Sequence, residues 1–290
     1  MASATDTPII SFTPIGLAHA RVSASTEANS GVISPQSTTT GPFIIAVEGN
    51  IGSGKTTLVE VMREHITKFL TPDVIAGREI IFYEEPLDEW AAIRDSAGET
   101  MLAKFYADQK KYAFAFQIMA LMSRLEIFHR LIRNNPNSII ICERSMLTHR
   151  RIFFQMLADD GVIDDVCFQV YKRWFDHMID EINVAGYVYV RADPVVSHRR
   201  VLKRAREGET IPLEYLAKCH RYHETWLREI AGNKILVLNG NVEFPQENVA
   251  EEYMPWLQEI ALFITQQDGW HAYSSYPRVE YDITEQEISP

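Results

Sequence analysis

Short hydrophobic runs alternate with longer amphipathic stretches between residues 43 and 266, and this alternation predicts the fold. The short runs are rich in β-branched and aromatic residues, and the longer ones repeat apolar residues at helical spacing. The predicted strands are Phe43–Glu48, Glu79–Glu84, Ser138–Cys142, Gly186–Arg191 and Lys234–Leu238. Strands separated by helices are typical of a parallel sheet covered by helices, so the pattern predicts one doubly wound α/β domain.

Helices are predicted between and after these strands. They are Lys55–Phe69, a long stretch from about Gly98 to Arg133, Asp164–Glu181, Pro194–Arg206, Pro212–Ile230 and Gln246–Gln266. Because proline has no backbone N–H to donate, Pro255 should kink or divide the last helix. Ligands of such sheets bind beyond the carboxyl ends of the strands, so the residues that follow each strand are the functional candidates.

The first predicted strand continues into a glycine-rich turn and then into a helix. The turn matches G-x-x-x-x-G-K-[ST] and consists of Gly49, Asn50, Ile51, Gly52, Ser53, Gly54, Lys55 and Thr56, with Thr57 directly after it. Glycines let successive N–H groups converge on phosphate oxygens, Lys55 adds positive charge, and the Thr56 hydroxyl can bind Mg²⁺. A chance glycine turn would lack the flanking strand and helix, so this is a predicted phosphate-binding loop.

Composition limits the other possibilities. The chain has 290 residues, of which 46% are hydrophobic, enough for a sizeable core. Its 28 basic residues against 39 acidic ones argue against a general nucleic-acid binder. Three widely spaced cysteines indicate neither a disulfide framework nor a metal site, which fits a reducing compartment. No apolar run approaches the ~20 residues needed to span a bilayer, so no membrane partner is expected.

Residues 1–41 are rich in Ser, Thr, Ala and Pro and predict a flexible extension. A mitochondrial presequence is the alternative. Such peptides are rich in arginine and poor in acids, whereas this segment contains Asp6, Glu27 and a single arginine, Arg21. A cytoplasmic location is therefore expected rather than a mitochondrial one.

Charged residues follow the second and third predicted strands. Glu85, in the segment EEPLDEW, could accept a proton from a hydroxyl that attacks a γ-phosphate, although an acidic loop is the commoner explanation of such a segment. After the third strand, Glu143 can hold Mg²⁺ while Arg144 offsets charge on phosphate or acceptor.

A dense cation cluster follows the fourth strand. It comprises Arg199, Arg200, Lys203, Arg204 and Arg206. In an acidic protein such a cluster indicates an anionic partner, although a solvated helix face is the usual explanation of a charge run. Because the cluster continues into Glu-Gly-Glu-Thr, typical of a mobile loop, it predicts a lid that closes over phosphates.

Four segments in this order resemble the deoxyribonucleoside kinases of the deoxycytidine, deoxyguanosine and mitochondrial thymidine kinase type. They are GNIGSGKTT, EEPLDEW, CERS and RAREGETIPLEYLAKCHRYHETWL, and the resemblance extends from about Phe43 to Thr265. It implies a P-loop kinase fold with an arginine-rich lid over residues 42–265, followed by a C-terminal extension at 266–290. It also implies an ATP- and Mg²⁺-dependent salvage enzyme, a homodimer, that phosphorylates the 5′-hydroxyl of a deoxynucleoside.

The resemblance assigns roles residue by residue. Glu85 matches the general base, Arg144 the arginine that contacts the 5′-hydroxyl, and Glu143, with Thr56, the Mg²⁺ site. Tyr106 and Glu209 match the pair that holds the 3′-hydroxyl, with Glu207 as the alternative because the lid is one residue shorter than in several relatives. The remaining matches are Trp90, Phe116 and Phe153 as aromatic walls, Gln117 as reader of the base edge, Arg200, Arg204 and Arg206 as lid arginines, and Phe244 as the residue that stacks on the donor adenine.

Base preference depends on three positions. Ala120 followed four residues later by Arg124 resembles the deoxycytidine and purine kinases, in which that arginine pairs with an aspartate. His149 stands in place of this aspartate and, as a neutral imidazole, can donate or accept a hydrogen bond. The expected substrate is deoxyadenosine, with deoxycytidine as the alternative.

Two other classes stay open at this point. A nucleoside-monophosphate kinase would share the loop and lid, but a carboxylate at Glu85 would repel its phosphate acceptor. A non-catalytic kinase-like accessory subunit would not be expected to retain the charged residues that catalysis requires. The aromatic residues of the C-terminal extension, Trp270, Tyr273, Tyr276 and Tyr281, could cover another subunit or their own domain.

Overall fold

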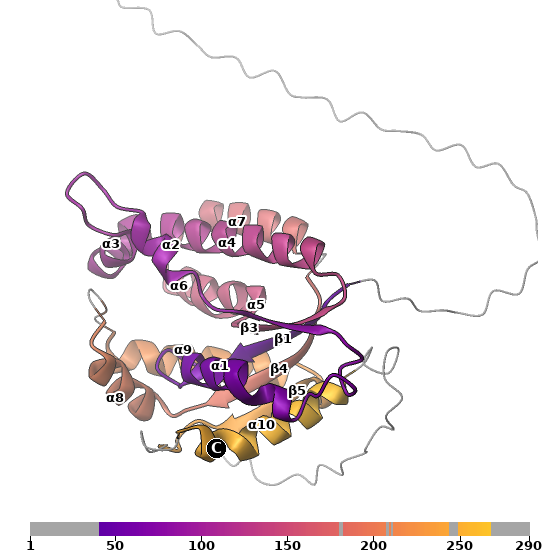
Figure 1. Cartoon of the computed structure of the whole chain (residues 1–290). Coiled ribbons are helices and arrows are strands. Elements are labelled where there is room, and N and C mark those ends of the chain that lie inside the picture. The colour runs from indigo at the N-terminus through magenta and orange to yellow at the C-terminus, as the bar shows by residue number, and fades with distance from the viewer. Residues whose placement is uncertain (1–40, 180–181, 207–208, 210, 244–248, 268–290) are drawn as a thin grey trace, which may run out of the picture. The chain divides into compact units, whose positions relative to one another are not determined.

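The computed structural model describes residues 41–179, 182–206, 209, 211–243 and 249–267 (Figure 1). The expected N-terminal extension up to residue 40, the C-terminal extension from residue 268, Glu207 and Phe244 lie outside the described residues.

Five parallel strands form the sheet, which confirms the predicted α/β class. They are β1 (Phe43–Glu48), β2 (Glu79–Tyr83), β3 (Ser138–Glu143), β4 (Val184–Arg191) and β5 (Ile235–Asn239). Their order across the sheet is β2-β3-β1-β4-β5, so the strand that leads into the phosphate-binding loop is central. Because all strands run in the same direction, the segments that follow them meet at one edge.

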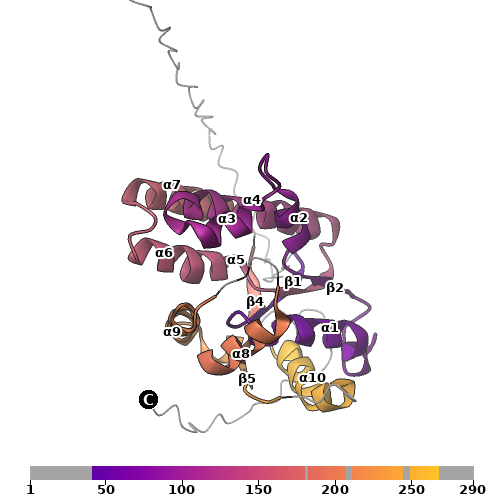
Figure 2. The ribbon, with the colours of Figure 1, turned by 90° about the vertical axis from the view of Figure 1, so that its left-hand side faces the viewer.

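Helices cover both faces of this sheet (Figures 1 and 2). The α-helices are α1 (Lys55–His65), α2 (Leu87–Ala92), α3 (Met101–Ala107), α4 (Gln109–Asn134), α5 (Met146–Thr148), α6 (Gln155–Asp159), α7 (Asp165–Met178), α8 (Pro194–Arg204), α9 (Leu213–Arg228) and α10 (Val249–Thr265). Short 3₁₀ turns lie at Ile66–Lys68 and Gly232–Lys234, and a π-helical segment at His149–Phe154. None of the described helices is long and apolar enough to cross a membrane.

The side-chain alternation of the strands divides the core into two layers. On β1, Ile44 and Ala46 belong to the cluster that includes α4 and α7, whereas Phe43, Ile45 and Val47 belong to the cluster that includes α1 and α10. Figure 2 shows these two helix layers on opposite sides of the strands. Because successive side chains point to opposite faces, shifting by one residue along a strand moves a side chain from one core layer to the other.

One helix prediction is wrong, and one of the two effects expected of Pro255 is excluded. The long helix expected from Gly98 to Arg133 is broken at Asp108, which has φ −147° and caps α4 by accepting from the N–H of Lys111 at 3.2 Å. An aspartate stabilises a helix N-terminus and so starts a new helix there. Pro255 does not divide α10, because the buried face formed by Leu257, Ile260 and Ile264 packs in the core and offsets the lost hydrogen bond.

The segment from Met146 to Asp159, for which no helix was predicted, is helical throughout. Its middle part, His149–Phe154, is a π-helix, a rare form that widens a helical turn and is frequent at functional sites. Helix α2 was also not predicted, since its six residues are too few to show a helical repeat.

Gly52 provides a test of the loop geometry. Its φ is +77°, and an added Cβ would lie 2.5 Å from the carbonyl oxygen of Ser197, whereas Gly77 has φ +69° with no atom within 4 Å of such a Cβ. Gly52→Ala should therefore lower the melting temperature and weaken ATP binding. In the matched control, Gly77→Ala, the free energy of unfolding should fall only by the cost of the left-handed backbone, about 1–2 kcal/mol. Equal melting temperatures for the two variants would contradict this account.

Candidate active site

The conformation of the phosphate-binding loop is set by its glycine backbone and by the hydrogen bonds of one amide side chain. Gly49, Gly52 and Gly54 all have positive φ, and Gly54 is followed directly by the first residue of α1. The Asn50 amide nitrogen donates to the carbonyl oxygen of Leu216 at 2.8 Å, and its oxygen accepts from the N–H of Ile51 at 2.9 Å. The helix N-terminus thus faces the loop without a side-chain cap, as a phosphate site requires.

Lys55 lies almost completely buried at the base of the loop. Its Nζ donates to the carbonyl oxygen of Asn50 at 2.7 Å and lies 3.9 Å from Glu143 Oε1. Burial, followed by the positive charge of Arg144, lowers the pKa of Lys55 to about 7. A phosphate group in the loop would supply the negative charge that stabilises its protonated form.

The Thr56 hydroxyl and the Glu143 carboxylate lie together beside Lys55. The Thr56 hydroxyl lies 3.1 and 3.0 Å from the two carboxylate oxygens of Glu143, and burial raises the pKa of Glu143. Hydroxyl and carboxylate oxygens suit Mg²⁺, which commonly takes one or two protein ligands together with substrate phosphates. The described residues contain no cluster of three or more His, Cys, Asp or Glu side chains suited to a metal, so phosphates would have to complete such a site.

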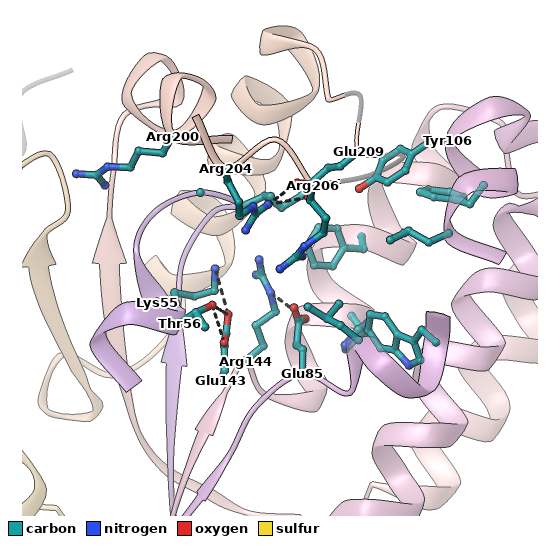
Figure 3. Close-up of a pocket in the computed structure, with 18 of the residues that line it drawn as sticks. Lys55, Thr56, Glu85, Tyr106, Glu143, Arg144, Arg200, Arg204, Arg206 and Glu209 are labelled. Carbon is teal, nitrogen blue, oxygen red and sulfur yellow. Dashed lines mark hydrogen bonds and ion pairs between the residues drawn. The ribbon is translucent and has the colours of Figure 1, made fainter. Parts of the chain in front are cut away.

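Arg144 connects the loop to the carboxylate that follows β2. Its Nη1 donates to the carbonyl oxygen of Gly49 at 2.8 Å, and its Nε lies 3.1 Å from Glu85 Oε1. Figure 3 shows Arg144 between the pair of Lys55 and Glu143 and the carboxylate of Glu85. The arginine therefore stands where a phosphate bound in the loop would meet an acceptor near Glu85.

These groups line one cavity of about 440 Å³. The predicted site residues that line it are Ile51, Gly52, Gly54, Lys55, Thr56, Thr57, Glu85, Trp90, Tyr106, Phe116, Gln117, Glu143, Arg144, His149, Phe153, Arg200, Arg204, Arg206 and Glu209. Gly49, Asn50, Ser53 and Arg124 do not line the cavity. Segments more than 150 residues apart in the chain thus form a single site with a phosphate end and an aromatic end.

Aromatic rings form the end of the cavity away from the loop. Trp90 donates from Nε1 to Ser123 Oγ at 2.9 Å and packs edge-on against Phe116, whose ring stacks on Phe105 at 4.6 Å. Phe105 was not among the predicted site residues. It lies on α3, next to the predicted Tyr106, and lines the same cavity.

Two buried polar side chains interrupt this aromatic surface. Gln117 Oε1 and His149 Nε2 have no hydrogen-bond partner among the described residues, although both side chains are almost fully buried. Burial, followed by the charges of Arg124 and Arg144, holds the pKa of His149 well below its usual value, so this imidazole is neutral. Unpaired buried polar atoms are costly unless a water or a ligand completes their hydrogen bonds.

Arg124 lies behind the cavity wall and is fully buried. Its Nη2 donates to the carbonyl oxygens of Glu143 at 3.2 Å and Arg144 at 2.5 Å, and its guanidinium lies over the ring of Tyr83. Arg124 thus does not line the cavity, and its Nη2 bonds to the backbone at the end of β3.

The lid arginines divide into two groups. Arg204 donates to both carboxylate oxygens of Glu209 at 2.7 and 2.6 Å, and Arg206 points into the cavity in Figure 3. Arg200 points away, with its guanidinium bonded to the carbonyl oxygens of Ser53 at 3.1 Å and Gly240 at 2.7 Å. Arg200 therefore braces the phosphate-binding loop in this structure.

Tyr106 and Glu209 meet at the junction of lid and cavity. Both line the cavity, and Figure 3 shows them together near Arg204. Burial, followed by the nearby Glu209, raises the pKa of Tyr106, so its hydroxyl is protonated and can donate. The two residues expected to hold a sugar hydroxyl, Tyr106 and Glu209, therefore lie together at the edge of the cavity.

The sequence matches the model of a known family, described as deoxynucleoside kinase, over residues 45–260. The chain belongs to the deoxynucleoside kinase family. Deoxycytidine kinase 2 of Gallus gallus is 30% identical over 251 residues, covering 76% of this chain and 90% of the relative. A fowlpox virus protein named as a probable deoxycytidine kinase is 31% identical over 208 residues, covering 69% and 80%. Human mitochondrial thymidine kinase 2 is 32% identical over 187 residues, covering 63% and 64%.

Membership of the deoxynucleoside kinase family confirms the predicted fold and activity. The chain is an ATP-dependent deoxynucleoside kinase, whose two substrates are a nucleotide phosphate donor and a deoxynucleoside. Family membership does not decide between deoxycytidine and thymidine as substrates, because the relatives named for each are about equally identical to this chain. Besides Phe105, the prediction missed Glu48, the last residue of β1, which is buried beside the site and belongs to no fixed position of a motif.

The two groups of lid arginines should respond differently to substitution. Arg206→Ala should lower kcat about 10³-fold with little change in nucleoside KM, because the arginine offsets charge on the transferring phosphoryl group. Arg200→Ala, used as the comparison, should chiefly raise the KM for ATP and lower the melting temperature, because it removes the brace on the loop. Steady-state kinetics of both variants test this, and a near-normal kcat for Arg206→Ala would remove that residue from catalysis.

Proposed function

We propose that this kinase transfers the γ-phosphate of ATP to the 5′-hydroxyl of a purine deoxynucleoside, with deoxyadenosine as the preferred substrate. The proposal is carried by one observation, the pair of unpaired polar atoms on Gln117 and the neutral His149 at the aromatic end of the cavity. Adenine presents an amino donor together with ring-nitrogen acceptors. The Gln117 amide can pair with the amino group and one ring nitrogen, which leaves a His149 N–H for the second ring nitrogen of a purine.

In the proposed transfer, each charged group acts at one position along the reacting atoms. Lys55 and the loop N–H groups hold the donor phosphates, and Thr56 with Glu143 would hold Mg²⁺, which neutralises developing negative charge when bound. Glu85 draws the proton from the 5′-hydroxyl, and its contact with Arg144 orients the carboxylate. Arg204 and Arg206 close on the phosphoryl group as it moves.

Deoxycytidine is the second candidate because several of the similar proteins carry that name. Cytosine also presents an amino donor beside a ring acceptor, so the Gln117 amide would serve both bases. The two candidates differ at His149, since cytosine has no second ring acceptor on that edge.

A competition assay decides between them. ADP release should be fastest with deoxyadenosine among the four deoxynucleosides, with negligible release from deoxynucleoside monophosphates, since Glu85 repels a phosphate acceptor. His149→Asp replaces a possible donor with an acceptor and should lower the ratio of deoxyadenosine to deoxycytidine kcat/KM about tenfold or more. Thymidine as the best substrate would overturn the base preference, and Glu85→Gln supplies the low-activity control.

We also propose that the kinase is a homodimer. On α7, Val166, Val170 and Trp174 recur at a spacing of four residues with exposed fractions of 70%, 42% and 50%, which forms an apolar stripe on the outer helix layer (Figure 1). A second copy of the chain would bury such a stripe.

Substitution on the stripe tests the dimer. Trp174→Glu should reduce the mass measured by light scattering from that of two chains to that of one, because a charge cannot be buried unpaired at an interface. Val195→Glu, at an exposed apolar residue of α8, is the matched control and should leave the mass unchanged. A dimer that persists in Trp174→Glu would exclude this face of α7.

A further inference from the structure

One peptide group at the site, the one between Arg144 and Ser145, is held at both ends by charged side chains from other elements. Its carbonyl oxygen accepts from Nη2 of Arg124, on α4, at 2.5 Å. Its N–H donates to Oε1 of Glu48, at the end of β1, at 2.8 Å. A cation therefore faces the oxygen of this peptide, and an anion faces its nitrogen.

Both charged side chains are removed from water. Arg124 and Glu48 are each 0% exposed, and the second carboxylate oxygen of Glu48 accepts from the hydroxyl of Thr148 at 2.5 Å. Hydrogen bonds with an ionised partner are about twice as strong as neutral ones, and a low dielectric strengthens them further. The peptide between Arg144 and Ser145 thus has its orientation set by two strong and opposite contacts.

The residue at this peptide needs such restraint. Arg144 has φ +62°, in the left-handed region that non-glycine residues rarely adopt. Strained backbone of this kind persists where the surroundings over-determine it. In this conformation the side chain of Arg144 reaches the carbonyl oxygen of Gly49 and the carboxylate of Glu85.

We propose that Glu48 and Arg124 are positioning residues, which hold the strained peptide after Arg144 and thereby set the contact between Arg144 and Glu85. Neither residue lines the cavity. Arg124 also restrains the Glu85 carboxylate directly, because its Nη1 lies 4.0 Å from Glu85 Oε1. The inference rests on the proposed roles of Arg144 and Glu85 in catalysis.

Glu48→Gln is the decisive variant because glutamine keeps the shape and one acceptor oxygen but loses the charge. It should lower kcat about 10-fold to 100-fold with the KM values for ATP and deoxyadenosine within about threefold of wild type, since small misplacement of catalytic groups mainly slows the chemical step. In an Arg144→Ala background, the same substitution should lower kcat less than about twofold, because the residue through which Glu48 acts is already absent.

Ile139→Val, in the core layer on the opposite face of β3, controls for loss of stability. It should lower the melting temperature with kcat unchanged. An unchanged kcat in Glu48→Gln would overturn the inference while Arg144→Ala still reported on the proposed catalysis. If Glu48→Gln lowered kcat equally in the wild-type and Arg144→Ala backgrounds, the inference would also be overturned, because the effect would then be a general structural one.

A measurement independent of activity tests the peptide directly. In full-length protein labelled with ¹⁵N-serine, the Ser145 amide proton, assigned with Ser145→Ala, should move upfield in Glu48→Gln as the charged acceptor is lost. An unmoved Ser145 resonance would overturn the inference whatever the kinetics. If the wild-type chain phosphorylated no deoxynucleoside, the proposed function would be wrong. The chemical shift of the Ser145 amide proton would then still test whether Glu48 holds this peptide.

Discussion

The contact between Arg144 and Glu85 is the interaction on which the site depends. It joins the segment after β3 to the segment after β2, and the same arginine donates to the carbonyl oxygen of Gly49 after β1. Parallel strands bring these three segments to one edge, but they do not orient the side chains. A strained backbone at Arg144 supplies the orientation, and buried charges sustain the strain.

Charge is distributed over the cavity in a way that suits phosphoryl transfer. Burial, followed by the positive charge of Arg144, lowers the pKa of Lys55, and a bound anion would offset both effects. The aromatic end contains the neutral His149 instead of another charge. Charged groups therefore gather at one end of the cavity and neutral polar atoms at the other, which is the division that the proposed function requires.

Local sequence was sufficient for the strands, because their apolar runs are bounded by turns and alternate with helical repeats. It was insufficient where one residue changes the path of the chain. Asp108 divides a continuous apolar pattern into two helices, and the capping preference of aspartate was the available signal. The π-helical turn at His149–Phe154, which contacts α9 and α4, leaves no comparable trace in the local sequence pattern.

The sequence by itself determined the phosphate-binding loop, the positions of the strands along the chain and the kinase family, since each is encoded in contiguous residues with fixed spacing. Only the tertiary structure decided how Arg124, Arg200 and Glu48 are used. The sequence predicted Arg124 at the base and Arg200 at the phosphates, and it did not single out Glu48; the fold directs all three to backbone groups. Helix and strand packing selects which neighbour a long charged side chain reaches, and neighbours distant in the chain cannot be read from spacing.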